Sequence, residues 1–157
     1  MEVASRRATP DDLPVLVDLY RSLEKEMVAL HRMWPLAGGL SEPVEDSLAG
    51  SLDDPDTSIY LGTIDGVPVG LLLIRIEQLL PQAGGARVGA IRLVFVDHEA
   101  REVGVGEIMR DQALREHRAI GIRLFDAHVL PGHRLAKNFF EAGGFAARAI
   151  VMHHADE

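Results

Sequence analysis

The chain has 157 residues, of which 47% are hydrophobic and 25% charged, a balance typical of one globular domain long enough to bury a core. Because it contains no cysteine, neither a disulfide framework nor a thiolate metal site is expected, which fits a reducing cytoplasm. The net charge of −8 argues against non-specific nucleic-acid binding. It fits either a cationic amine substrate or merely an acidic, solubilising surface.

No targeting or membrane segment is expected. The first twenty residues contain several charges and no apolar run, so the sequence predicts no secretory signal. The longest apolar stretches are far too short to span a bilayer. The sequence therefore predicts a cytoplasmic protein.

The N-terminal part predicts a short strand and two helices. Alternation from Val3 indicates the strand, and Thr9–Asp12 is typical of a helix start, with a capping threonine, a proline in the first turn and two acids. The following apolar residues recur at helical spacing: Leu13, Leu16, Tyr20, Leu23, Met27 and Leu30. The stretch "WPLAGG" ends this pattern, and a second short helix is expected from Ser41 to about Leu52.

The middle of the chain predicts three strands joined by hairpins. Asp65-Gly66 indicates a tight turn between strands at 58–64 and 67–80, and "PQAGGAR" a second hairpin before a strand at 88–97. A loop, a helix to about Ile120, a strand at 122–130, a helix closed by Gly143-Gly144 and a final strand at 147–155 follow. The order βααβββαβαβ predicts a mixed sheet covered by helices in one α+β domain.

The loop "REVGVG" at Arg101–Gly106 lies between a strand and a helix. A helix start has unpaired amides and partial positive charge, so it can bind an anion, and Gly104 and Gly106 let a diphosphate approach the backbone. Arg101 could add a charged contact. From these residues alone, a plain strand-to-helix turn is the favoured explanation of the loop, because a single Gly-x-Gly is a weak signal.

Two motifs give the chain a resemblance to the GNAT superfamily of acyl-CoA N-acyltransferases over essentially its whole length, residues 1–157. Arg101-Glu102-Val103-Gly104-Val105-Gly106 is similar to the acetyl-CoA motif Gln/Arg-x-x-Gly-x-Gly/Ala. The stretch from Ala136 to Phe145, "AKNFFEAGGF", is similar to the second hallmark, Ala-x-x-Phe/Leu-Tyr-Glu-x-x-Gly-Phe. The resemblance implies a three-layer α/β/α fold with a mixed, mostly antiparallel sheet, splayed fourth and fifth strands, and helices on both faces.

The resemblance also implies where acetyl-CoA, the co-substrate, is held. Backbone groups of Phe95 and Val96 would pair with the pantetheine arm, and the amides of 101–106 would hold the pyrophosphate. Phe140 would pack along the arm. His133 would either hydrogen-bond the pantetheine or help to start the last helix. No metal is implied.

The catalytic groups depart from the family pattern. Phe140 replaces the usual tyrosine and cannot protonate the leaving thiolate. His128 is our candidate general base, since a glutamate stands at the matching position in related protein N-terminal acetyltransferases; a half-buried strand histidine is the alternative. Many members use a glutamate on the fourth strand, where this chain offers Gly89–Arg92 and no carboxylate. Glu77 could reach a substrate amine or be a solvated strand-end charge.

Other polar residues admit simpler explanations. Asp97-His98 indicates turn chemistry, and His153-His154 cannot chelate a metal together because adjacent strand residues point to opposite faces. The stretch with His31 and Trp34 either forms part of an acceptor pocket or is a hydrophobic loop packed on the sheet.

The resemblance predicts an N-acetyltransferase that moves acetyl from acetyl-CoA directly to a primary amine of a small molecule, a peptide N-terminus or a lysine. The alternative is a non-catalytic acyl-CoA-binding sensor or regulatory module. Exposed strand edges and apolar terminal strands are also compatible with a homodimer.

Overall fold

Five strands form one sheet in the order in which they occur along the chain. The computed structural model describes residues 1–157, with strands β1 (Val3–Arg7), β2 (Thr57–Ile64), β3 (Val67–Gln78), β4 (Arg87–Val96) and β5 (Leu124–Ala127). Neighbouring strands are antiparallel except for β4 and β5, which are parallel. The predicted mixed, mostly antiparallel sheet is confirmed.

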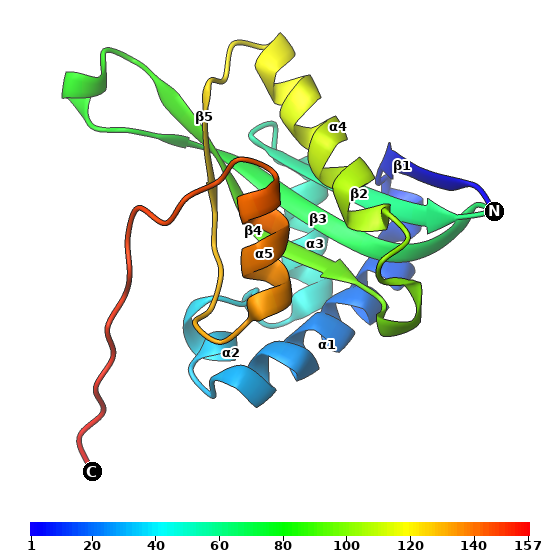
Figure 1. Cartoon of the computed structure of the whole chain (residues 1–157), viewed down its shortest axis with the longest axis horizontal. Coiled ribbons are helices and arrows are strands. Elements are labelled where there is room, and N and C mark those ends of the chain that lie inside the picture. The colour runs from blue at the N-terminus through cyan, green and yellow to red at the C-terminus, as the bar shows by residue number, and fades with distance from the viewer.

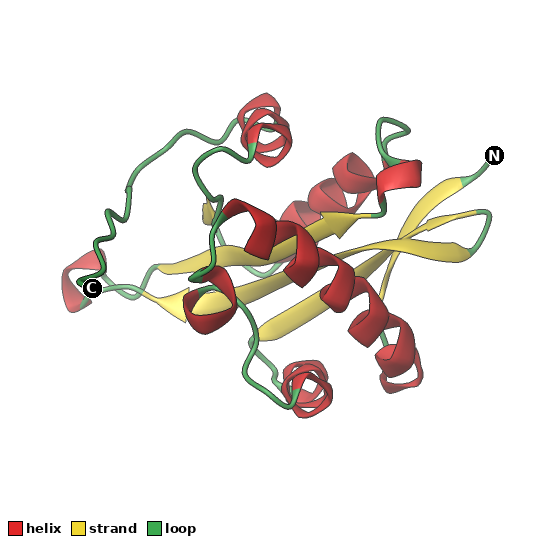
Figure 2. Cartoon of the chain, turned by 90° about the horizontal axis from the view of Figure 1, so that it is seen from below, coloured by secondary structure: helices red, strands yellow, loops and turns green.

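Helices cover both faces of this sheet (Figures 1 and 2). On one face lie α1 (Leu13–Leu30), the single turn α2 (Trp34–Ala37) and α3 (Val44–Asp53). On the other lie α4 (Val105–Ala119) and α5 (Arg134–Ala142). None of the helices combines the length and apolarity that crossing a bilayer requires.

Local signals in the sequence explain where several elements begin. The Thr9 N–H donates to Oδ2 of Asp12 at 2.8 Å, and the 3-10 turn Pro10–Asp12 leads directly into α1. Asp65 and Gly66 have φ angles of 50° and 82°, the left-handed pair that a two-residue hairpin between β2 and β3 needs. These two predictions are confirmed.

The strands divide their side chains between two cores. Alternation puts Leu71 and Leu73 of β3 against α1 and α3, whereas Leu72 and Ile74 face α4 and α5. Buried residues therefore follow one another without a polar break along β2 and β3, as in a sheet covered on both sides.

The close approach of α4 to β2 depends on Gly62, where an added Cβ would collide with Cγ1 of Val105. We expect Gly62→Ala to lower the free energy of unfolding by about 1–3 kcal/mol, because α4 would have to move off the sheet. Gly50→Ala in α3 is the matched control. Its Cβ meets no atom within 4 Å, and the change should stabilise the fold by about 0.5–1 kcal/mol. Urea unfolding measures both, and equal shifts in the two variants would contradict this packing.

The predicted final strand is wrong. Residues 146–157 form no strand and no backbone hydrogen bond, and all of them are exposed. Figure 1 shows this segment leaving α5 and running free of the sheet to the C-terminus. β5 pairs only with β4 and is therefore the edge strand of the sheet.

Two elements have other boundaries than those predicted, and one short helix was not predicted. The strand expected at 122–130 pairs only over Leu124–Ala127, and the second helix begins at Val44 instead of Ser41. The stretch "WPLAGG" contains the one-turn helix α2, which packs Trp34 into the core.

Candidate active site

The sheet opens between its two parallel strands. β4 and β5 pair from Val88 with Leu124 to Ile91 with Ala127, and the His128 N–H donates to the Ile91 carbonyl at 3.1 Å. Beyond that point β4 continues to Val96, while the chain after His128 forms no further backbone hydrogen bond with it. We call the space between the diverging segments 92–96 and 129–133 the gap. The predicted splay of these strands is confirmed.

A β-bulge at Arg92 lies where the gap begins. Leu73 pairs with Leu93 and Ile74 with Ile91, which leaves Arg92 as an extra residue in β4. As a result Ile91 packs towards α4 and Leu93 towards α1, although residues two apart in a regular strand share a face. Because a bulge bends its strand and increases the local twist, it accounts for the divergence of β4 from β5.

Only one of the two residues expected to pair with a ligand arm has its backbone on the gap side. The Asp97 N–H donates to the Val69 carbonyl of β3 at 2.7 Å, so alternation turns the backbone of Val96 towards the gap and that of Phe95 towards β3. The Val96 carbonyl already accepts Nε of Arg101 at 2.9 Å. The Phe95 side chain is buried in the α1 core.

The loop after β4 curls into the first turn of α4. Glu102 and Gly104 have φ angles of 70° and 93°, and Gly104 is the N-cap of α4. The first amides of that helix have no partner within it and carry partial positive charge. A non-glycine residue held at positive φ stores about 1–3 kcal/mol, and such residues cluster at ligand sites. The loop fits an anion through its backbone.

The two glycines of this loop have different roles. A Cβ on Gly104 would point into open space, whereas one on Gly106 would lie 3.0 Å from the Phe139 ring. Gly106 therefore allows α5 to pack on α4, and Gly104 alone leaves room in front of the loop amides. Arg101 is also not where the motif suggests, because its guanidinium turns inwards to Glu26 at 2.7 Å. Glu102 and Val103 remain exposed at the loop surface.

A charged cluster occupies the closed end of the gap. Arg92 bonds both carboxylate oxygens of Glu77, at 2.8 and 2.6 Å, and its Nη1 lies 3.4 Å from Nδ1 of His128. Partial desolvation, and then the Arg92 guanidinium, lower the pKa of His128, so its ring is neutral at pH 7. The sequence offered no carboxylate on β4 here, but Arg92 holds one that comes from β3.

The sequence model of the Acetyltransferase (GNAT) family matches residues 18–145, most of the chain. The chain belongs to this family. No curated protein matches the sequence.

Solved structures share this GNAT fold at low sequence identity. A Bacillus halodurans protein, solved as a tetramutant, has a TM-score of 0.81 at 17% identity, with 99% of each chain covered. AAC(6')-Iy, in complex with the bisubstrate analogue CoA-S-monomethyl-acetylneamine, has a TM-score of 0.72 at 19% identity, covering 100% of this chain and 99% of its own. A ribosomal-protein-alanine N-acetyltransferase from Brucella melitensis biovar Abortus 2308 has 0.71 at 15%, with the same coverage.

In this GNAT chain two residues expected beside the coenzyme, Phe140 and His133, have structural roles in α5. Phe140 is 3% exposed and its ring meets those of Phe139 and Phe145 edge-on, so it is a core residue with no proton to donate. His133 caps α5 through Nδ1, which accepts the Ala136 N–H at 3.1 Å. Of the two roles expected for His133, the structure shows the start of the helix.

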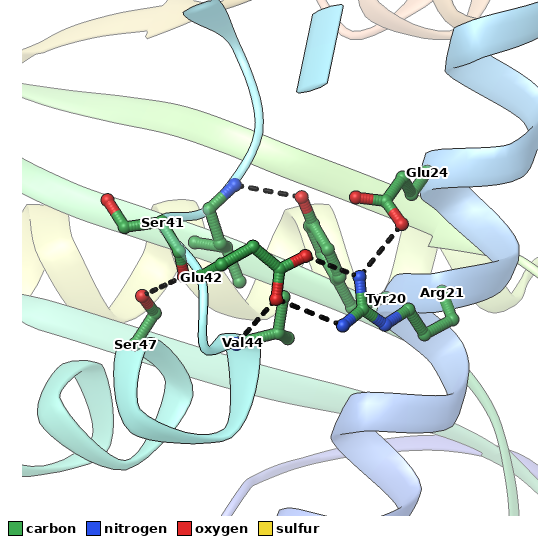
Figure 3. A network of polar contacts seen from close by, with 8 residues as sticks. Tyr20, Arg21, Glu24, Ser41, Glu42, Val44 and Ser47 are labelled. Carbon is green, nitrogen blue, oxygen red and sulfur yellow. Dashed lines mark hydrogen bonds and ion pairs between the residues drawn. The ribbon is translucent and has the colours of Figure 1, made fainter. Parts of the chain in front are cut away.

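The segment between α1 and α3, expected to border the acceptor site, is tied to α1 by the polar network in Figure 3. The Tyr20 hydroxyl accepts the Leu40 N–H at 2.8 Å, and Arg21 bonds Glu24 and Glu42, each at 2.9 Å. Trp34, 8% exposed, stacks on Tyr20 with ring centroids 6.1 Å apart. Of the two explanations offered for this stretch, Trp34 follows the hydrophobic one.

Proposed function

We propose that the chain is an N-acetyltransferase that moves acetyl from acetyl-CoA directly to a primary amine. The observation that carries this proposal is the gap between β4 and β5. It has an amide-lined loop at its open end and a neutral imidazole at its closed end. A long ligand with a phosphate head and a reactive tip fits that arrangement.

The coenzyme would be held mainly by backbone groups. The amides of residues 101–106 would bind the pyrophosphate, since Gly104 leaves the space in front of them free and Arg101 turns away. The pantetheine arm would run along the gap-facing edge of β4, with the thioester near His128. When bound, acetyl-CoA supplies an activated acyl group whose leaving group is a thiolate.

The residues at the closed end would manage the proton of the acceptor. A protonated amine must lose one proton before its nitrogen attacks, and neutral His128 can take it. The new N–C bond then forms as the C–S bond breaks, and the thiolate leaves with the electron pair. The acylated nitrogen releases its extra proton, which leaves a neutral amide and balances the protonation of the thiolate. Phe140 cannot protonate that thiolate, so we assign this step to water. Positioning both reactants in the gap supplies much of the rate.

The acceptor class is narrowed only by charge and by similarity. The net charge of −8 favours a cationic amine. Structural neighbours are named as aminoglycoside and ribosomal-protein-alanine acetyltransferases, which act on amines of small-molecule and peptide type. We propose an acceptor in this range: a small molecule, a peptide N-terminus or a lysine. A non-catalytic acyl-CoA sensor is the second candidate, and the buried Phe140 favours it.

Calorimetry with acetyl-CoA, followed by a free-thiol assay over a panel of amines, tests both candidates. An acetyltransferase binds the coenzyme and releases CoA thiol in the presence of an accepted amine. A sensor binds it and releases no thiol with any amine. A protein that does not bind acetyl-CoA would contradict both.

We also propose that the C-terminal segment 146–154 pairs with a second copy of the chain. Ile150, Val151 and Met152 are 74%, 90% and 88% exposed, and the outer edge of β5 has no partner. Arg148 reaches Asp126 of β5 through its side chain at 2.7 Å, yet the backbones do not pair. The C-terminal segment of a second copy, paired with the free edge of β5, would satisfy the backbone groups of that edge and cover the apolar side chains of both copies.

We expect the purified protein to sediment as a dimer and Val151→Asp to sediment as a monomer, because the added charge would be buried between segments. Ala155→Asp, just beyond the segment, adds the same charge and should leave the dimer intact. Analytical ultracentrifugation over a range of concentrations makes the comparison. A wild-type protein that stays monomeric would overturn the pairing.

A further inference from the structure

Glu26, near the end of α1, contacts both sides of the gap with one carboxylate. Its Oε2 lies 2.7 Å from Nη2 of Arg101, and its Oε1 lies 3.2 Å from Nε2 of His133. Arg101 belongs to the loop that follows β4, and His133 ends the segment that follows β5. Glu26 therefore joins the two segments at the end of the gap away from His128.

The hydrogen bonds around Glu26 are mutually consistent. Nδ1 of His133 accepts the Ala136 N–H, so in the neutral ring the proton lies on Nε2, the atom that faces Oε1 of Glu26. Arg101 likewise uses Nε for the Val96 carbonyl and Nη2 for Glu26. The side chains of Glu26, Arg101 and His133 are only 27%, 21% and 14% exposed. This arrangement fixes each of them.

Apart from Glu26, no side chain bonds the segments on both sides of the gap at its open end. The Arg92–His128 contact lies at the closed end, and Nη1 of Arg110 donates to the Phe139 carbonyl between α4 and α5. Segments 92–96 and 129–133 share no backbone hydrogen bond. Without Glu26 the open end would be joined only by the packing of apolar side chains such as Leu130 on the α1 core.

We infer that Glu26 is a positioning residue that sets the width of the gap at its open end. The inference rests on the proposed function, in which the pantetheine arm enters there. A gap already held at its binding width avoids the ordering cost of binding a flexible one. Glu26 also neutralises Arg101, so the phosphate loop gains no net charge from that side chain.

Two ligands separate this role from general support of the loop. Coenzyme A carries the pantetheine arm, whereas 3′-phospho-ADP has only its phosphate-bearing head. In Glu26→Ala we expect the affinity for coenzyme A to fall about tenfold relative to that for 3′-phospho-ADP, because only the arm needs the preset gap, whereas the Arg101 charge that the variant uncovers acts on the phosphates of both ligands. Glu24→Ala is the control, since it removes a carboxylate from the same helix that pairs instead with Arg21.

The width itself can be measured, because the chain has no cysteine to interfere with labelling. Spin labels on Glu99→Cys and Arg134→Cys, both exposed, report the distance across the open end. We expect one narrow distance distribution in the otherwise wild-type protein and a broader one after Glu26→Ala. Glu24→Ala should keep the narrow distribution.

The outcomes distinguish the two proposals. If the wild type binds neither ligand, the proposed function fails, and the label distances still test whether Glu26 sets the width of the gap. If Glu26→Ala weakens both ligands equally, or leaves the distance distribution narrow, Glu26 does not set the gap. Urea unfolding of Glu26→Ala shows whether the variant remains folded at the temperature of each measurement.

Discussion

Replacing Gly104 with glutamate is expected to lower the affinity for acetyl-CoA about 10- to 100-fold, since one charge-assisted hydrogen bond is worth about 1.5–3 kcal/mol. The side chain would start from the open space in front of the α4 amides, the place assigned to the pyrophosphate. Its carboxylate would both fill that space and repel phosphate. Isothermal titration calorimetry gives the affinity.

Gly84→Glu is the matched control for this variant. Gly84 also has a positive φ, 67°, and free space around its Cβ, but it lies in the turn between β3 and β4 at the other end of the strands. Both variants should lose about 1–2 kcal/mol of folding free energy through the left-handed backbone. Only Gly104→Glu should lose the ligand. Undiminished binding by Gly104→Glu would contradict the assignment of this loop to the coenzyme site.

Changing His128 to alanine is expected to reduce turnover at pH 7.5 about 100-fold, the lower range of what a general base contributes, with acetyl-CoA affinity unchanged. The ring lies at the closed end of the gap, where the backbone N–H of His128 donates to the Ile91 carbonyl and fixes the chain. Its pKa is lowered, so the wild-type ring stays unprotonated down to a pH below 6.5. The rate should fall only when pH drops through that lowered pKa.

The pH profile of kcat/KM for an accepted amine therefore separates this role from a structural one. The acid limb should lie below pH 6.5 in the wild type and be lost in His128→Ala. His154→Ala, with a ring 84% exposed in the C-terminal segment, should keep the wild-type profile. Equal turnover in His128→Ala and the wild type would show that His128 is a structural strand histidine and not the general base.

The site residues were predictable where a short motif fixes the backbone, and not where side-chain partners come from afar. The loop at 101–106 and the helix after it follow from glycine spacing and helix chemistry. The inward turn of Arg101 depends on Glu26, 75 residues earlier in the chain. Phe140 was identified as lacking a proton donor, but its burial among other aromatic rings depends on how α5 packs.

Glu77 was named as a candidate from the sequence, but its pairing with Arg92 at the closed end of the gap was not predicted, for a similar reason. Glu77 and Arg92 meet across β3 and β4, and their pairing depends on the bulge at Arg92. A bulge leaves no reliable trace in hydropathy, because it changes the register by one residue without changing composition. Opposite charges near two strand ends were the only available signal.

By itself the sequence determined the order of the strands and longer helices as far as α5, the start of α1, the Asp65-Gly66 hairpin, the family and the loop at Gly104. All of these depend on the conformational preferences of neighbouring residues or on motifs that lie within one short segment. Only the tertiary structure decided that β4 bulges at Arg92, that Glu26 joins both sides of the gap, and that residues 146–157 find no place in the sheet. Those features depend on strand register and on contacts between distant segments, which local patterns do not specify.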